Sequence, residues 1–478
     1  MLWLALRFPL LPLEIFTRGT AISSPIAIAD STEAKATVIA CNEEARRHGI
    51  VAGMPATAAA ALAASLRVVS RDAPAERAAL ERVAAWAIQF TPTVSIAAAN
   101  EILLEVEGST RFFGGLNRLW ADIMQKIGAT GYTVEIAGAP TPLAAQLFAR
   151  AGLSPRIHHD DALRLSLASL PTSVLDLSPE LSDLLQDIGA GTIGECLGLP
   201  RDGLARRGGR ELLAQLDRAL GAVPDPRPVF APPQNFKAML PLPAPVENAE
   251  MLLFAARRLI AELCGLLAAT SKGAQHLEFL LSHEDAPETR LPLNLVTASR
   301  DPSHLTSVLR ERLARTRLPS PATAMTLESR MLLPLAPANR AFLPDEREQS
   351  EALDRLVERL RARLGENAVQ GLDVVADHRP ERAWDAHKPG NGNGVRIDWH
   401  PSARPLWLLC KPRPLSQVQD VPQYEGPLTR LTAAERIESG WWDGNDIGRE
   451  YFVARNPAQS LLWIYRDGRG WHLHGFFS

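Results

Sequence analysis

The chain has few cysteines, and they follow no regular spacing. Its 4 cysteines are scattered over 478 residues without a CxxC or a Cys/His pattern. Structural zinc sites and disulfide frameworks both depend on regular spacings of this kind. We therefore expect neither a zinc site nor a disulfide scaffold, and we expect a reducing cytoplasm as the compartment.

Long apolar runs and a net charge of one sign are also missing. No apolar run reaches the roughly 20 residues that a membrane-spanning helix needs, so no membrane partner is expected. The N-terminal apolar stretch has no basic residue before it and is interrupted by Arg7, Pro9 and Pro12, which favours a buried first strand over a signal peptide. The net charge is −3, which restricts any nucleic-acid surface to a local patch.

Length and composition predict an α+β protein of several domains. With 46% hydrophobic and 22% charged residues, the chain is globular in composition and too long for one core. Strand-like patterns at 2–8, 100–108 and 133–139 alternate with helical patterns at 76–90 and about 115–127. Short helical patterns follow, and a Pro-rich linker precedes the next module. The expected divisions are 1–150 with an insertion at about 20–75, then 151–222, 234–340, 347–394 and 395–478.

A glycine turn lies between two short helical patterns at 184–209. Gly189, Gly191 and Thr192 form this turn, as in a helix-hairpin-helix unit, where backbone N–H groups at a helix N-terminus meet a DNA phosphate. The same pattern is typical of an ordinary αα-hairpin. Both interpretations stay open from the sequence.

Arginines gather in the module that follows the linker. Helices are expected at 248–268 and 302–316, and strands at 275–283 and 324–335. The candidate DNA-binding residues near these helices are Arg257, Arg310, Arg312 and Arg315. A solvated helix face is the alternative, because most charge runs are no more than that.

Residues 395–478 are rich in Trp and in short strand-like runs, after a charged helix at 347–365 and a glycine-rich segment at 387–394. A small β-rich module is predicted. The neighbouring Trp441 and Trp442 are either core residues or exposed partner-binding anchors, and we expect at least one of them in the core.

The stretch NEILLEVEGSTRFFGG (100–115) resembles the palm motif of the Y-family, or lesion-bypass, DNA polymerases. That motif is written S-I-D-E-A-x-L-D-V-T-G-S, and Val106 and Gly108 set the register. The metal-binding Asp of the motif then corresponds to Asn100, and its Glu corresponds to Glu101. The resemblance implies the frame of a polymerase site with part of its chemistry lost.

The first strand resembles a second motif of the same family, I-D-M-D-A-F-F-A-S-V-E. It aligns with LALRFPLLPLE (4–14) through Glu14, which places Ala5 at the metal-binding Asp and Leu10 at the aromatic sugar gate. Such polymerases hold two Mg²⁺ ions with three acids, and Mg²⁺ requires carboxylate oxygens. Only Glu101 remains of the three, so no catalytic residue, metal or cofactor is expected.

The fingers motif S-N-Y-E-A-R-x-x-G-V-x-x-G-M matches CNEEARRHGIVAGM (41–54) at most fixed positions. Arg46 keeps the triphosphate-contacting arginine, whereas Glu43 replaces the tyrosine and would repel a triphosphate. The family's phosphate-binding lysine, expected near 149–156, is absent. The site for an incoming nucleotide is therefore a vestige.

The Y-family resemblance implies a right-hand architecture for the first 340 residues. The palm would be 1–150 with the fingers inserted at about 20–75, the helical thumb 151–222, and a βα little finger 234–340. The β-rich C-terminal module is an addition. The alternative to a non-catalytic protein is a weakly active lesion-bypass polymerase, in which Glu105 and Glu107 would share one strand face and hold Mg²⁺.

The C-terminal region resembles the ImuB-type branch of this family at ERIESGWWDG, REYFVA and GWHLHGFF. This resemblance implies a non-catalytic adaptor in SOS-induced translesion synthesis and mutagenesis. The implied partners are primer-template or damaged DNA, the sliding clamp, ImuA and an error-prone C-family DNA polymerase, with RecA as a further candidate. A protein-interaction scaffold without DNA contact is the remaining alternative.

A clamp-binding peptide of such proteins usually contains Gln-x-x-Leu-Phe. The corresponding segment here, ANRAFLPDE (338–346), keeps Phe342 and Leu343 but has no Gln. These two residues are the possible clamp contact, and a plain linker is the alternative.

Overall fold

The computed structural model describes residues 1–19, 24–31, 36–157, 160–335, 346–389 and 404–477. It divides into two compact units, Met1–Arg363 and Leu364–Ser478. The two units are described separately below. None of the described helices is both long and apolar enough to cross a membrane.

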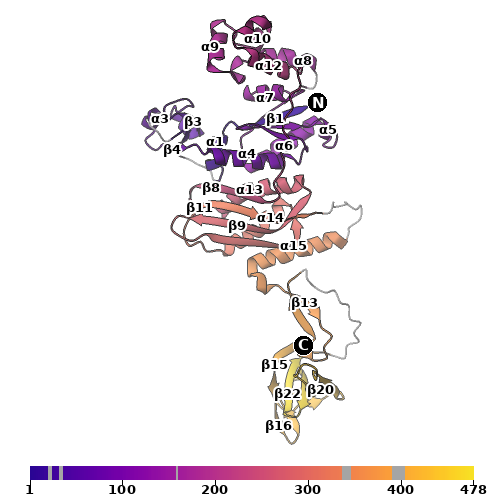
Figure 1. Cartoon of the computed structure of the whole chain (residues 1–478). Coiled ribbons are helices and arrows are strands. Elements are labelled where there is room, and N and C mark those ends of the chain that lie inside the picture. Colours follow the sequence, from indigo (N-terminus) through magenta and orange to yellow (C-terminus); the bar gives the residue numbers. More distant parts are fainter. Residues whose placement is uncertain (20–23, 32–35, 158–159, 336–345, 390–403, 478) are drawn as a thin grey trace. The chain divides into compact units, whose positions relative to one another are not determined.

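An antiparallel sheet of four strands lies at the centre of the first unit (Figure 1), in the order β5-β6-β1-β7. The predicted strands at the N-terminus, at 100–108 and at 133–139 all form. The fourth strand, β5, comes from the Ala-rich run before the palm motif, which was not expected to be a strand. The bounds are β1 Trp3–Arg7, β5 Val94–Ala98, β6 Glu101–Glu105 and β7 Glu135–Ala139.

The two faces of this sheet pack against different layers. Along β1, Leu4 and Leu6 point toward α4 (Ala73–Ala87) and α6 (Leu116–Thr130), with which they form one core. Trp3 and Ala5 belong to the core on the opposite face. This alternation follows from the two-residue period of a strand, and in β6 it places Glu101 and Leu103 on the α7 face and Ile102 and Leu104 on the other face.

The second face is covered by α7 (Pro142–Arg150), and a set of short helices packs against α7. No strand occurs in the described part of 151–222, as the sequence predicts. The helices are α8 Asp160–Ala168, α9 Pro179–Asp187, α10 Ile193–Gly198, α11 Arg201–Arg206 and α12 Arg210–Ala219.

A small separate sheet lies within residues 26–70, with the strand order β3-β2-β4. Its core is built largely from alanines, together with Val38, Cys41 and Ile50. The elements are β2 Ile26–Ala29, β3 Val38–Cys41, α2 Glu43–Arg47, α3 Ala56–Leu62 and β4 Arg67–Ser70, preceded by α1 Leu11–Thr17.

The module after the linker is an antiparallel sheet in the order β10-β9-β11-β8, with β12 also paired to β9. Two helices, α13 and α14, cover one face of it (Figure 1). The charged helix α15 packs near β10 and α14 through Glu358, whose carboxylate accepts from the Val296 amide and contacts His304 at 2.5 Å. The elements are β8 Phe236–Val246, α13 Ala249–Ala269, β9 Lys272–His283, β10 Thr289–Ser299, α14 Pro302–Arg315, β11 Ala322–Ser329, β12 Leu332–Pro334 and α15 Glu346–Leu364.

Two strands of this module, β8 and β10, were not expected from the sequence. Both contain proline, at Pro241, Pro243, Pro245 and Pro292, which argues against a central strand. Both strands lie at the edges of the sheet, where the missing proline N–H costs no ladder hydrogen bond.

Helix α13 packs closely against α4 and α6. A Cβ on Gly265 would lie 2.0 Å from Cδ1 of Trp86, so only glycine allows this approach. Beside it, the buried Glu262 carboxylate accepts from Arg18 and, at 3.0 Å, from Nε of Arg82. The palm sheet and the module after the linker are therefore joined by a buried ion triad.

The second unit is a β-rich module, as predicted, with the strand order β15-β22-β21-β20-β18 and with β19 also paired to β20. Its aromatic core includes Tyr451 and Trp463, whose rings stack at 4.1 Å between centroids. A separate hairpin joins β13 and β14. The main strands are β13 Gly371–Val374, β14 Trp384–His387, β15 Trp407–Pro414, β18 Thr429–Arg430, β19 Glu435–Ser439, β20 Ile447–Arg455, β21 Leu461–Asp467 and β22 Gly470–Phe476.

Candidate functional site

The palm motif and the first strand meet on the α7 face of the central sheet. Ala5 pairs with Leu103 across β1 and β6, and Arg7 pairs with Glu101. Ala5 is fully buried, and its methyl group lies in the core between the sheet and α7. The methyl group offers no ligand atom for a metal.

Glu101 is buried and fully engaged by two side chains from α7. Nε of Arg150 donates to Oε1 at 2.7 Å and Nη2 donates to Oε2 at 3.0 Å, while Nε2 of Gln146 donates to Oε2 at 2.7 Å. Burial by itself lowers the pKa of Arg150, but the hydrogen bonds and the charge of Glu101 raise it by more. The net pKa therefore lies above its ordinary value, and the guanidinium stays charged. These three residues are called the Glu101 cluster below.

The Glu101 cluster is chemically unsuited to Mg²⁺. A divalent ion on Glu101 would lie near the Arg150 guanidinium, and at about 4 Å their repulsion is on the order of 8 kcal/mol for an effective dielectric of 20. Asn100, at the start of the strand, offers an amide in place of a second carboxylate and donates to the Phe8 carbonyl at 3.4 Å. Within the described residues no group of three His, Cys, Asp or Glu side chains could hold a metal.

Other charged residues near Glu101 pair elsewhere. Arg7 lies opposite Glu101 across β1 and β6, but its side chain donates to Glu135 at 2.6 Å. The prediction that Glu105 and Glu107 share a strand face is wrong, because β6 ends at Glu105 and Glu107 begins the short helix α5 (Glu107–Thr110). Glu107 instead pairs with the N-terminal amino group at 2.8 Å.

The nucleotide-binding vestige is self-neutralised. In α2, Nη1 of Arg46 lies 3.2 Å from Glu43, and both side chains are largely exposed. Leu10 occupies the N-cap of α1 with an aliphatic side chain. Triphosphate binding here would require breaking the Arg46–Glu43 pair and would still leave an acid beside the phosphates.

The glycine turn forms as predicted between α9 and α10. Gly189 has φ of +73°, and Thr192 caps α10 in a capping box with Glu195. The hydrogen bond from the Thr192 N–H lowers the pKa of Glu195. The Thr192 amide is thus already bonded at 2.8 Å, and the DNA contact predicted for Gly189, Gly191 and Thr192 stays a prediction.

The predicted arginines of the module after the linker separate into two groups. Arg257 and Arg310 line a cleft of about 830 Å³ formed by α4, α6, α13 and the start of α14. Arg312 and Arg315 lie on α14 but do not line it. The cleft, called the basic cleft below, carries five cationic side chains and no acidic one: Lys126, Arg257, Arg258, Arg300 and Arg310.

The expectation that Trp441 or Trp442 lies in the core is wrong. Their exposed fractions are 81% and 56%, and their rings meet edge to face at 5.6 Å. Arg379 lies 5.6 Å from the ring centre of Trp442 and forms ion pairs with Asp377 and Asp443. This pair is therefore an exposed aromatic surface beside the ion pairs of Arg379.

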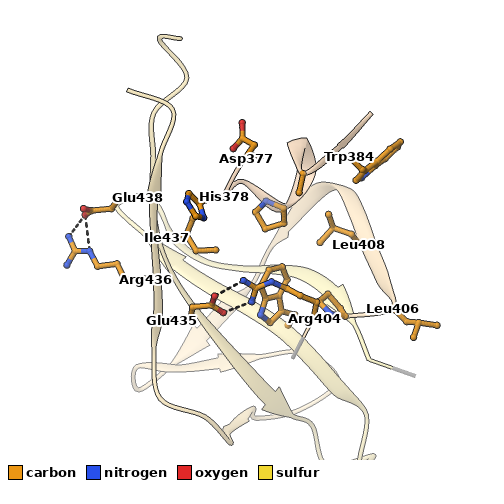
Figure 2. A pocket seen from close by; sticks show the side chains of 14 residues that line it. Asp377, His378, Trp384, Arg404, Leu406, Leu408, Glu435, Arg436, Ile437 and Glu438 are labelled. Carbon is orange, nitrogen blue, oxygen red and sulfur yellow. Dashed lines mark hydrogen bonds and ion pairs between the residues drawn. The ribbon is translucent and has the colours of Figure 1, made fainter. Parts of the chain in front are cut away.

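A second surface of the same unit is a pocket of about 590 Å³. Figure 2 shows Trp384, Leu406 and Leu408 on one side and the strand residues 435–438 on the other. Arg404 and Glu435 form a bidentate pair at its floor. Trp441 and Trp442 do not line this pocket. The possible clamp contact, Phe342 and Leu343, lies outside the described residues.

Comparison with known proteins identifies relatives over most of the chain. The family described as impB/mucB/samB matches residues 18–150. Protein ImuB of Caulobacter vibrioides is 27% identical over 458 residues, which cover 90% of this chain and 100% of that protein. This chain is a homologue of ImuB and carries a Y-family polymerase domain.

More distant relatives match less of the chain or match it less closely. A DNA polymerase IV of Pseudomonas fluorescens is 26% identical over 124 residues, covering 26% of this chain and 35% of that enzyme. The structure of DinB from Sulfolobus solfataricus has a TM-score of 0.40 and 17% identity, covering 70% of this chain and 100% of that one.

Several residues of these sites were missed from the sequence. Arg150 lies inside the segment in which the family's phosphate-binding lysine is expected, and the sequence does not indicate its role because its partner Glu101 is 49 residues away. Glu262 is a carboxylate in an otherwise apolar part of α13, a pattern that signals a buried ion pair but not its partners.

Proposed function

We propose that this ImuB homologue is a non-catalytic, DNA-binding adaptor in SOS-induced translesion synthesis and mutagenesis. The observation that carries the proposal is the Glu101 cluster. The one acid left at the metal-binding positions is buried and held by Arg150 and Gln146, while Ala5 lies in the core. Two Mg²⁺ ions find no ligands there, and phosphoryl transfer depends on them.

DNA binding is supported by the basic residues of the module after the linker, since phosphate contacts need clustered cations rather than a positive net charge. The ImuB resemblance adds the sliding clamp, ImuA, an error-prone C-family polymerase and RecA as proposed partners. The exposed Trp441 and Trp442 support a partner-binding role for the second unit, because tryptophan is enriched among the residues that contribute most to protein–protein binding.

Primer extension tests the loss of catalysis. The full chain is incubated with primer-template DNA, damaged and undamaged, with the four deoxynucleoside triphosphates and either Mg²⁺ or Mn²⁺. We expect no extension. Incorporation that disappears in Glu101→Ala would establish an active site and overturn the proposal, whereas incorporation that persists in that variant would indicate a contaminating polymerase.

Partner binding is tested by pull-down of ImuA, the clamp and the C-family polymerase with the full chain. Trp441→Ala combined with Trp442→Ala should reduce capture of at least one protein partner about tenfold or more. Trp407→Ala is the matched control, because Trp407 is 75% exposed in the same unit but lies outside the pair. Equal losses for both variants would argue against a specific role for Trp441 and Trp442.

A further inference from the structure

The basic cleft lies between two helical layers of the first unit. Trp86 of α4 and Lys126 of α6 line one side of it, and Arg257, Arg258 and Arg310 of α13 and α14 line the other. Since α4 and α6 cover the face of the central sheet opposite to α7, the cleft is on the other side of that sheet from the Glu101 cluster. A molecule bound in the cleft would not reach the palm centre.

The positive charge of the cleft is only partly neutralised by the protein. Lys126 pairs with Asp122 at 2.9 Å, and Arg310 lies 3.9 Å from Glu250. In the part of the chain that the structure describes, no ion pair involves the other three cations, Arg257, Arg258 and Arg300. This excess of cations favours an anionic ligand.

The environment of Arg258 disfavours its positive charge, because nearby acids compensate that charge only in part. Arg258 is half-buried over the ring of Phe254, with 4.6 Å between the guanidinium carbon and the ring centre. Burial lowers the pKa of Arg258, the charge of Arg18 lowers it further, and Glu14 offsets only part of this effect. A phosphate near Arg258 would supply the missing negative charge.

The cleft also presents apolar and hydroxyl groups beside its cations. Phe254 is 42% exposed, and the wall next to it contains Ala261, Cys264 and Ala268. Ser303, Thr306 and Ser307 of α14 add hydroxyls on the same side. Cations next to an aromatic ring and an apolar wall suit unstacked bases joined by phosphates, whereas a duplex keeps its bases inside and would leave the apolar wall unused.

The opposite face of the same module lacks these properties. On the sheet face turned away from α13 and α14, Lys237 pairs with Glu328 at 2.7 Å. Arg290 lies 3.7 Å from Glu278 and 3.6 Å from Glu288. Cations and acids are balanced there, so the anion-binding potential of the module is concentrated on its helical face.

We propose that the basic cleft binds a single-stranded nucleic-acid segment, with phosphates on Arg257, Arg300 and Arg310 and a base against Phe254 and Arg258. This inference rests on the proposed DNA-binding function and assigns it to one cleft and one strand form. It also separates the predicted arginines, because Arg312 and Arg315 lie outside the cleft.

Fluorescence anisotropy with the full chain tests the proposal. The probes are a labelled 20-nucleotide oligothymidylate, a duplex of the same length and a primer-template, each titrated at several salt concentrations. The cleft variant is Arg257→Gln with Arg310→Gln. The matched control is Arg312→Gln with Arg315→Gln, which also removes two positive charges but takes both from residues of α14 outside the cleft. Phe254→Leu removes the ring and keeps the charge.

The cleft variant should bind the oligothymidylate about tenfold more weakly at 0.1 M salt and reduce the slope of log affinity against log salt by about 1. The control pair should change affinity less than about twofold. Phe254→Leu should weaken binding of the single strand about threefold or more and leave duplex binding unchanged, because only an unstacked base meets the ring.

Each other outcome points to a definite conclusion. Equal losses in the cleft variant and the control pair would overturn the cleft and indicate a diffuse basic surface. Tight duplex binding without single-strand binding would overturn the inference but leave the adaptor proposal intact. No binding to any of the three probes by the unmodified chain would overturn the proposed DNA-binding function itself. Unchanged thermal unfolding midpoints would show that each variant is folded.

Discussion

The Glu101 cluster and the basic cleft are charged sites on opposite faces of the same central sheet, and they differ in how their charges are compensated. Glu101 has its counter-charge within the protein, in a bidentate pair with Arg150. Arg257, Arg258 and Arg300 have no ion pair in the described part of the chain. A charge that the protein itself neutralises contributes to folding, whereas a charge left without a partner is available to a ligand.

The two sites therefore suit different roles. At the palm, Ala5 and the Glu101–Arg150 pair form part of a packed interior. At the cleft, five cationic side chains lie together and no acidic side chain lines the same surface. The predictions below test this contrast from the largest expected effect to the smallest.

The buried triad offers the strongest test of internal compensation. Glu262→Gln would leave Arg18 and Arg82 without their shared acid, and we expect a loss of about 3–5 kcal/mol in the free energy of unfolding. Chemical denaturation of the full chain, followed through the unfolding of the first unit, measures this loss. Replacing all three residues by Met or Leu should restore most of it; a Glu262→Gln variant as stable as the unmodified chain would contradict the prediction.

The same triad predicts a pH dependence. Burial raises the pKa of Glu262, but the charges of Arg18 and Arg82 lower it more, so the folded-state pKa lies below the ordinary value of 4.5. The stabilisation is therefore complete above pH 4.5 and is lost as the pH falls through the lowered pKa. Glu262→Gln should remove this part of the acid sensitivity in denaturation experiments at pH 3 to 5.

The Glu101 cluster should behave as a structural ion pair. Arg150→Met would leave the buried Glu101 carboxylate with Gln146 alone, and we expect destabilisation by about 3 kcal/mol. Adding Glu101→Leu should recover most of that loss, since it removes the uncompensated charge. If Arg150→Met is neutral and the variant binds Mn²⁺ in a titration followed by electron paramagnetic resonance, the palm would still be a metal site.

The second unit contains a buried histidine whose neutral form is favoured by burial, although Nε2 of His474 lies 3.9 Å from Glu381. His474 is fully buried, Nδ1 lies 2.8 Å from the Tyr451 hydroxyl, and burial lowers its pKa to about 4. An unfolded histidine binds its proton near pH 6.5, so the unit should lose roughly 2 kcal/mol of stability between pH 7 and pH 5. Thermal unfolding of His474→Gln should show a smaller pH dependence over the same range.

The cleft should show the smallest effect on stability. Arg257→Gln and Arg300→Gln remove exposed cations that form no ion pair within the described residues, so we expect changes within about 0.5 kcal/mol in either direction. Thermal denaturation of each variant measures this. A loss comparable to that of Arg150→Met would mean that the cleft arginines are structural, and the contrast between the two sites would fail.

Much of the fold could be predicted from local patterns. Alternating apolar residues located β1, β6 and β7, and the helical period located α4, α6, α13 and α14. The edge strands β8 and β10 were missed because their prolines argue against strands, and only their edge position in the sheet makes prolines acceptable. The exposure of Trp441 was also missed, because sequence alone does not say which aromatic residues the core has room for.

The sequence by itself determined what the palm lacks: Ala5 has no side-chain ligand atom, and Asn100 offers a neutral amide where a carboxylate would be needed to balance the charge of a metal ion. Tertiary structure decided what the remaining charges do. Glu101 meets Arg150 across 49 residues, and Glu262 meets Arg18 across 244. It also decided that Arg310 faces a cleft while Arg312, on the same helix, does not. Electrostatic roles depend on distance and burial, and these arise only when distant segments pack together.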